Sequence, residues 1–254
     1  MITTKDGNSD PSERMGFMKL AIGDVALTSL WVFVLPFVGV TVSIISSIFS
    51  IKAASITALL VTVNVVSAMV FVFTVLAAAM GGANFNPSTT VFFYAVGMNP
   101  ADTLLSLAVR LPAQALGGIA GVMGVTRALP ATYKSMVRGP SLKTTIAKGA
   151  AVEALISFIF CAVLLLVVTR GPRMMLAKVW MLGVSTMAMV MAGKDFTGPS
   201  MNPANAYGWA YVNNWHNSSE LFFVYWLAPL LGATLSAFVF KAMAKPPQPK
   251  QKKA

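Results

Sequence analysis

Two short stretches carry side chains whose types and spacing could do chemistry: Asn86-Pro87-Ser88 and Asn202-Pro203-Ala204. Each follows a run of small residues and glycine, and each precedes a short, mostly apolar segment. An Asn side chain caps a helix by accepting hydrogen bonds from its unpaired backbone N–H groups, and Pro suits the first helical position. We therefore expect each stretch to be a loop that ends in a short helix, with a hydrogen-bonding amide at the start of that helix.

The composition places these two stretches in a membrane protein. The chain of 254 residues is 56% hydrophobic and 11% charged, whereas a soluble domain has about 25% charged residues. A helix of about ten residues is about 15 Å long, which is half of a hydrocarbon core of about 30 Å. The sequence therefore predicts two half-helices within the membrane.

Six longer apolar segments surround the half-helices. They are expected to span the membrane at residues 20–40, 56–80, 102–129, 149–169, 174–192 and 221–244, with the half-helices ending near residues 96 and 212. The predicted fold class is thus an all-α membrane protein with six transmembrane helices and two re-entrant half-helices. Residues 1–18 are predicted to be a disordered tail, residues 19–244 the membrane domain with halves at 19–129 and 149–244, and residues 245–254 a basic tail.

An even number of spans puts both termini on the same side of the membrane. With the termini in the cytoplasm, the majority of the 19 Lys and Arg residues lie on the cytoplasmic side, as the positive-inside rule favours. The net charge of +11 is therefore interpreted as basic loops facing anionic membrane lipid, and no nucleic-acid partner is expected.

The two halves of the membrane domain repeat one pattern. Asp24 followed by Thr28 matches Glu153 followed by Ser157, and each acid precedes one of the Asn-Pro stretches. Because each half has three spans, the second half must enter the membrane from the opposite face, which makes an inverted repeat. The two half-helices should then enter from opposite sides and meet near the midplane.

Two helix N-termini that meet aim positive partial charge at one central point, and each presents an Asn side chain there. Such a constriction would pass a neutral hydrogen-bonding solute and oppose a cation. Asp24 and Glu153 are expected to accept hydrogen bonds from unpaired backbone N–H groups of the two loops rather than to relay protons. Arg110, near the start of the third span, is expected to snorkel to the cytoplasmic interface.

The sequence offers no set of residues for enzymatic chemistry. One His and one Cys cannot by themselves form a metal cluster or an internal disulfide, and no phosphate-binding glycine loop is present. We therefore expect no enzyme activity, no metal site and no cofactor.

Further motifs lie in the third and sixth spans: Ala113-Gln114 with Gly117-Gly118, and Tyr225-Trp226 with Pro229 and Gly232-Ala233. Together with the two Asn-Pro stretches, here called the first and second boxes, and with the acids Asp24 and Glu153, these motifs resemble the aquaporin, or major intrinsic protein, family over about residues 18–244. Three features resemble the plant small basic intrinsic proteins, subgroup 1: the first box, which has Ser88 in place of Ala, the basic character of the chain and its Lys-rich tail. The resemblance implies a passive channel for water and other small neutral solutes, a homotetramer with one pore per subunit, and a location in the endoplasmic reticulum membrane.

The resemblance also assigns roles to individual positions. The residues of the two boxes would line the pore: Asn86, Pro87, Ser88, Asn202, Pro203 and Ala204. Counting from the boxes, the selectivity-filter positions of the family fall on Val66, Val190, Pro199 and Asn205. Asn205 replaces the Arg that usually follows the second box, so the filter should be wider or less polar than in a strict water channel.

Other readings remain open. A secondary transporter also uses inverted repeats and broken helices, and the unusual filter would suit a non-conducting structural or regulatory membrane subunit. Lys250 and Lys252 near the C-terminus resemble an endoplasmic reticulum retrieval signal, with a solvated basic tail as the alternative. Asn217-Ser218-Ser219 fits the N-glycosylation pattern, with closeness to the last span as the argument against its use.

Overall fold

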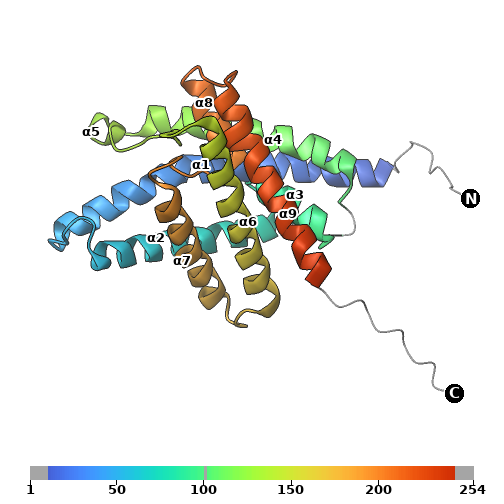
Figure 1. The fold of residues 1–254 in the computed structure, drawn as a ribbon, viewed down its shortest axis with the longest axis horizontal. Helices are drawn as coiled ribbons and strands as arrows, with labels where there is room; N and C mark the ends of the chain where they lie inside the picture. The colour runs from blue at the N-terminus through green and yellow to red at the C-terminus, as the bar shows by residue number, and fades with distance from the viewer. Residues whose placement is uncertain (1–10, 100–101, 244–254) are drawn as a thin grey trace, which may run out of the picture.

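The computed structural model describes residues 11–99 and 102–243, and this part of the chain consists of helices joined by loops (Figure 1). In chain order the elements are α1 (Pro11–Ile48), α2 (Ile56–Ala79), α3 (Pro87–Val96), α4 (Leu104–Ala128), α5 (Ala131–Lys134), α6 (Ile146–Arg170), α7 (Met175–Gly193), α8 (Pro203–Val212), the π-helix η1 (Leu221–Leu227) and α9 (Ala228–Met243). Within these described ranges, six segments are long and apolar enough to cross a membrane, and α3 and α8 are the two half-helices. The predicted fold class is confirmed.

The first helix is longer than the sequence suggested. α1 begins at Pro11, inside the tail that was predicted to be disordered as far as residue 18, so that prediction is wrong for residues 11–18. Pro is favoured in the first turn of a helix, and the residues that follow, Glu13, Arg14 and Met15, are good helix formers. Residues 1–10 and 244–254, which include the predicted basic tail and retrieval signal, lie outside the described residues.

The last span opens in a form that the sequence did not predict. Residues Leu221–Leu227 make the π-helix η1, which continues directly into α9. A π-helix pairs backbone groups five residues apart instead of four. The sequence Leu-Phe-Phe-Val-Tyr-Trp-Leu is uniformly apolar, so it has no hydrophobic periodicity from which this change of helical period could be predicted.

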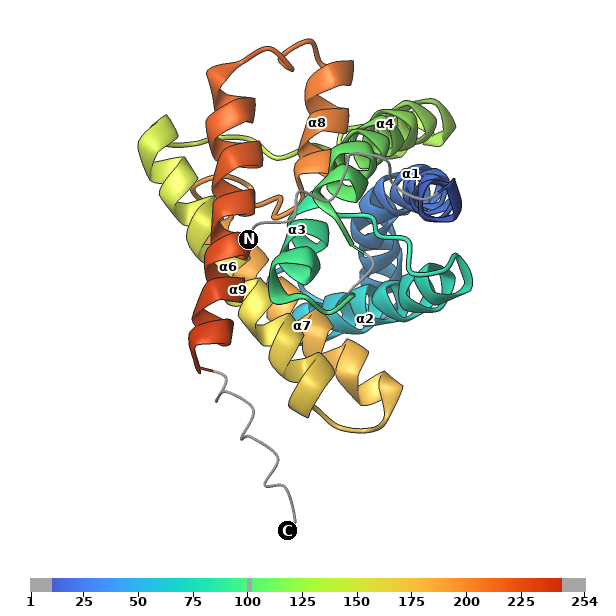
Figure 2. The same ribbon diagram turned by 90° about the vertical axis from the view of Figure 1, so that its right-hand side faces the viewer.

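The two halves have the same order of elements, with α1 to α4 repeated as α6, α7, α8 and η1–α9. Within each half the first span packs along the last, α1 against α4 and α6 against α9. Across the halves, α8 packs on α4 and α3 packs on α9, so each half-helix lies against the last span of the other half. In Figure 2, α3 lies in the middle of the other helices, with α8 and α4 above it and α1, α2, α7, α6 and α9 around its other sides.

Glycines in the last span of each half permit this close packing. A Cβ on Gly117 of α4 would lie 2.6 Å from the carbonyl oxygen of Val25 in α1. A Cβ on Gly232 of α9 would likewise collide with the carbonyl oxygen of Ala154 in α6, and one on Gly118 with that of Ala204 in α8. Small residues allow such approach between helices in a membrane, where no hydrophobic effect drives them together.

Candidate functional site

Both half-helices begin with the Asn-Pro cap expected from their sequences. Asn86 has an extended backbone, and its Oδ1 accepts from the N–H of Ser88 at 2.9 Å. Asn202 is also extended, and its Oδ1 accepts from the N–H groups of Ala204 at 3.1 Å and Asn205 at 3.4 Å. Pro87 and Pro203 occupy the first helical positions, where the missing N–H is not needed.

The two caps are joined to each other by a reciprocal pair of hydrogen bonds. Asn86 Nδ2 donates to the carbonyl oxygen of Met201 at 3.0 Å, and Asn202 Nδ2 donates to the carbonyl oxygen of Phe85 at 2.9 Å. Phe85 and Met201 directly precede the first and second boxes, so the two hydrogen bonds join equivalent positions of the inverted repeat. Each amide has two N–H donors, and this exchange uses one of them. The N-terminal ends of α3 and α8 therefore meet, and one amide N–H of each Asn is not used in this exchange.

The second loop is held by Glu153, which is fully buried. Its Oε1 accepts from Thr197 Oγ1 at 2.8 Å and from the N–H of Ser200 at 3.1 Å, and its Oε2 accepts from the N–H of Met201 at 3.1 Å. Met201 has a positive φ of 50°, which is unusual for a residue with a side chain. The carboxylate thus stabilises a strained backbone directly before Asn202.

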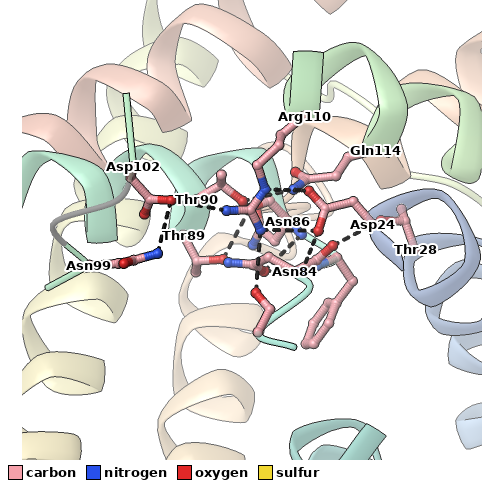
Figure 3. Close-up of polar contacts among 12 residues, drawn as sticks. Asp24, Thr28, Asn84, Asn86, Thr89, Thr90, Asn99, Asp102, Arg110 and Gln114 are labelled. Atoms are coloured by element: carbon pink, nitrogen blue, oxygen red, sulfur yellow. Dashed lines mark hydrogen bonds and ion pairs between the residues drawn. The ribbon is translucent and has the colours of Figure 1, made fainter. Parts of the chain in front are cut away.

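The first loop is held by Asp24, also fully buried, but with a different set of partners. Its Oδ1 accepts from the N–H of Asn84 at 2.6 Å, and its Oδ2 accepts from Gln114 Nε2 at 2.8 Å. Figure 3 shows Arg110 and Gln114 of α4 extending toward this carboxylate. Gln114 also donates to Thr90 Oγ1 at 2.8 Å, which connects α4 to the first turn of α3.

Arg110 does not snorkel to the interface, and that prediction is wrong. The residue is 4% exposed, and its Nε and Nη2 donate to the two carboxylate oxygens of Asp24 at 2.7 and 3.0 Å. A bidentate pair of this kind neutralises both charges where water is excluded. Arg110 Nη1 also lies 3.6 Å from Asp102 Oδ1, in the segment between α3 and α4. The partner of Arg110 is 86 residues away in the chain, so the local sequence could not reveal it.

A second feature that the sequence reasoning missed is the residue two positions before each box. Asn84 Oδ1 accepts from the N–H of Phe85 at 2.8 Å and from Thr89 Oγ1 at 3.0 Å. At the equivalent place in the second loop, Ser200 Oγ accepts from Asn205 Nδ2 at 3.4 Å. The signal that could have found them is the repeat itself, because the two positions match when the boxes are aligned.

The four positions proposed for the filter lie on four parts of the structure. Val66 is on α2 and Val190 is on α7, and these two helices pack against each other. Pro199 lies in the loop before the second box, close to Gly193 at the end of α7, and Asn205 lies in the first turn of α8. Val66 and Asn205 are buried.

Ser88 is the residue by which the first box differs from the second. It is buried, as is Ala204 at the matching position, and within the described residues its Oγ has no hydrogen-bond partner. The first turn of α3 therefore accommodates a hydroxyl group where the first turn of α8 has only the methyl group of Ala204.

Six apolar spans and two half-helices whose capped ends meet define a class of protein, a helical membrane channel built as an inverted repeat. Residues 12–240 match the sequence profile of the family described as major intrinsic protein. The chain is 44% identical to "Aquaporin SIP1-2" of Zea mays over 93% of this chain and 98% of that one, and 40% identical to "Aquaporin SIP1-1" of Arabidopsis thaliana over 94% and 98%. The chain therefore belongs to the major intrinsic protein family, within its SIP subgroup 1, and is a channel rather than an enzyme.

A solved structure shows the same fold. The aquaglyceroporin from Plasmodium falciparum superposes with a TM-score of 0.64 at 19% identity, covering 88% of this chain and 95% of that chain. At this identity the likeness concerns the fold.

Proposed function

We propose that the protein is a passive pore for water and other small neutral solutes, with its constriction where α3 and α8 meet. The observation that carries the proposal is the reciprocal bond between the boxes, in which Asn86 and Asn202 each use one amide N–H and keep another. A polar solute at this point can accept from both amides in turn. The positive ends of the two half-helices oppose a cation there.

The proposed filter of Val66, Val190, Pro199 and Asn205 is supported by the orientation of the Asn205 amide. Ser200 Oγ donates its one hydrogen to the carbonyl oxygen of Asn202 at 2.8 Å, so it can only accept from Asn205. Asn205 Nδ2 therefore faces Ser200, and Oδ1 is left without a partner among the described residues. The filter then offers a neutral acceptor in place of the positive charge of an Arg.

A cavity near these positions suits the mouth of a pore. It has a volume of about 640 Å³ and lies between the end of α1, the start of α2 and Met191 of α7. Met191 is next to Val190, and Thr62 in the wall lies one helical turn before Val66. Serine and threonine hydroxyl groups in the wall would keep such a mouth wetted.

The test is the permeability of proteoliposomes containing the full chain, measured by stopped-flow light scattering. We expect rapid water flux with a low activation energy, linear in the osmotic gradient. Glycerol, urea and hydrogen peroxide are measured in parallel to define the filter. Saturable flux that a second gradient can drive would indicate a secondary transporter, and water permeability equal to that of empty liposomes would indicate a non-conducting subunit.

The variant Asn202→Asp tests the constriction itself. It replaces an amide donor with a carboxylate, so the bond to the carbonyl oxygen of Phe85 is lost and a charge faces the narrow point. We expect a lower flux of neutral solutes per correctly folded channel. Asn213→Asp, at the exposed end of α8, makes the same chemical change and should leave the flux unaltered. Equal flux in Asn202→Asp and wild type would contradict the assigned site.

We also propose that four copies assemble as a homotetramer in the endoplasmic reticulum membrane, with both termini in the cytoplasm. The support is the relationship to the SIP proteins and the excess of basic residues on the side of the termini. Mass determination of the purified protein tests the assembly. Fusion of the C-terminal residues to a surface reporter tests retrieval, because a functional signal should keep the reporter inside the cell.

A further inference from the structure

The surface of the protein has a groove between α6 and α9. The cavity in it has a volume of about 200 Å³. One stripe of each helix forms its walls: Phe158, Ala162, Leu166 and Arg170 on α6, and Ser236, Val239, Phe240 and Met243 on α9. Spacings of three and four residues put each set on one face of its helix. The two helices lie side by side, and Figure 2 shows that their C-terminal ends diverge.

The walls of the groove are suited to a hydrocarbon chain. They are almost wholly apolar, and Leu166 and Met243 at the open end are 47% and 78% exposed. Both helices belong to segments able to span the membrane, so this surface meets lipid rather than water. Ser236, 2% exposed, lies in the wall, and within the described ranges its Oγ has no hydrogen-bond partner. An unpaired hydroxyl in apolar surroundings is unfavourable, and an occupant with an acceptor would satisfy it.

The mouth of the groove carries a positive charge. Arg170 is the last residue of α6, is exposed, and has no ion pair in the part of the chain that the structure describes. It begins the basic turn that leads through Arg173 to α7. A long cationic side chain at the end of a membrane-spanning helix reaches the level of the lipid headgroups. Its charge is complementary to a phosphate group.

We propose that this groove is a binding site for one anionic glycerophospholipid. An acyl chain lies along Leu166 and Phe240, the phosphate pairs with Arg170, and the Ser236 hydroxyl donates to an ester carbonyl. An apolar chain without a charged head would gain nothing from Arg170, and free phosphate would gain nothing from the apolar walls. This site is independent of the pore, so it holds whatever solute the channel conducts.

Native mass spectrometry of the full chain in detergent tests whether the charge of Arg170 contributes to lipid binding. The protein is titrated with dioleoyl-phosphatidylserine and, separately, with dioleoyl-phosphatidylcholine. We expect phosphatidylserine to bind about fivefold more tightly, the contribution of one basic side chain near the headgroups. Arg170→Gln should remove this preference. Arg173→Gln removes the same charge three residues away and should keep it. A preference that survives in Arg170→Gln, or is lost equally in both variants, would overturn the proposal in favour of a diffuse basic surface.

Substitutions that fill the groove test whether it binds an acyl chain. Ala162→Leu should weaken binding of both phospholipids, and Val239→Phe at the more exposed rim should do the same if Ala162→Leu does not fold. An excess of inorganic phosphate should not displace phosphatidylserine, since displacement would mean that the site recognises phosphate alone. A changed oligomeric state with unchanged lipid binding would show instead that a second copy of the chain covers the groove.

Discussion

The pair of Arg110 and Asp24 shows how two residues distant in sequence compensate each other's charge inside the membrane domain. Both side chains are buried, and each supplies the charge that the other needs. Asp24 also accepts from the N–H of Asn84, two residues before the first box. Removing one partner from a buried pair leaves an uncompensated charge, which costs more than the pair itself contributes. Arg110 is therefore a positioning residue for the first loop.

We expect Arg110→Gln to destabilise the protein by about 3–5 kcal/mol, the usual effect of breaking a buried ion pair. Thermal unfolding in detergent, followed by the loss of the folded peak in size-exclusion chromatography, measures the change. Arg127→Gln makes the same substitution at an exposed site on the same helix and should have little effect. The double variant Asp24→Asn, Arg110→Gln should recover part of the loss, because it leaves neither member of the pair as an uncompensated charge. Equal stability of wild type and Arg110→Gln would show that the pair is not formed.

At the proposed filter, Asn205 leads to an expectation about solute size. Arg in this position would add bulk and a positive charge beside Ser200. We expect Asn205→Arg to lower the permeability to glycerol and urea more than the permeability to water. The ratio of these permeabilities, measured in the same vesicles, does not depend on the amount of protein inserted. Asn213→Arg, at an exposed position, is the matched control. An unchanged ratio in Asn205→Arg would place the selective point elsewhere.

At the scale of elements, the sequence predicted what is encoded locally. Each half-helix starts at an Asn-Pro cap and ends after ten residues, at Val96 and Val212, as the apolar run indicated. The positions of Asp24 and Glu153 beneath the two loops also follow from the repeat. The ion pair of Arg110 and the π-helix η1 could not be predicted in the same way, since the first depends on a partner 86 residues away and the second on a small change of helical period.

The contact of α4 with α8 can be tested by adding a single methyl group. A Cβ on Gly118 would collide with the carbonyl oxygen of Ala204, in the first turn of α8 and within the second box. Overpacking of this kind typically costs about 1–3 kcal/mol, and here it also displaces the half-helix. We expect Gly118→Ala to fold less stably and to conduct less per folded channel.

Gly16→Ala is the control for this experiment. No atom lies within 4 Å of a Cβ built at Gly16 in α1, and Ala is the better helix former. This variant should be as stable as wild type and equally permeable. If Gly118→Ala behaved in the same way, the approach of α4 to α8 would have to be looser than the structure shows.

For the whole molecule, the two halves reach one geometry by different chemistry. When Gly117 is matched to Gly232, Arg110 corresponds to Tyr225. Tyr225 donates its hydroxyl to the carbonyl oxygen of Thr197 at 2.7 Å, and so supports the second loop without an ion pair. The second loop therefore needs its acid but no buried cation. The two halves thus share the hydrogen bonds that hold the loop backbone, but the supporting side chains, Arg110 in one half and Tyr225 in the other, differ.

The inverted repeat also fixes a topology that can be measured. Six spans return the chain to the side on which it started, and the half-helices do not change the count because each enters and leaves by one face. We expect epitope tags at both termini to be removed by protease added outside sealed microsomes. An epitope inserted at residues 214–218, between α8 and η1, should be protected because the proposed topology places this loop in the lumen. Removal of only one terminal tag would mean an odd number of spans, and protection of both tags would reverse the orientation that the basic residues favour.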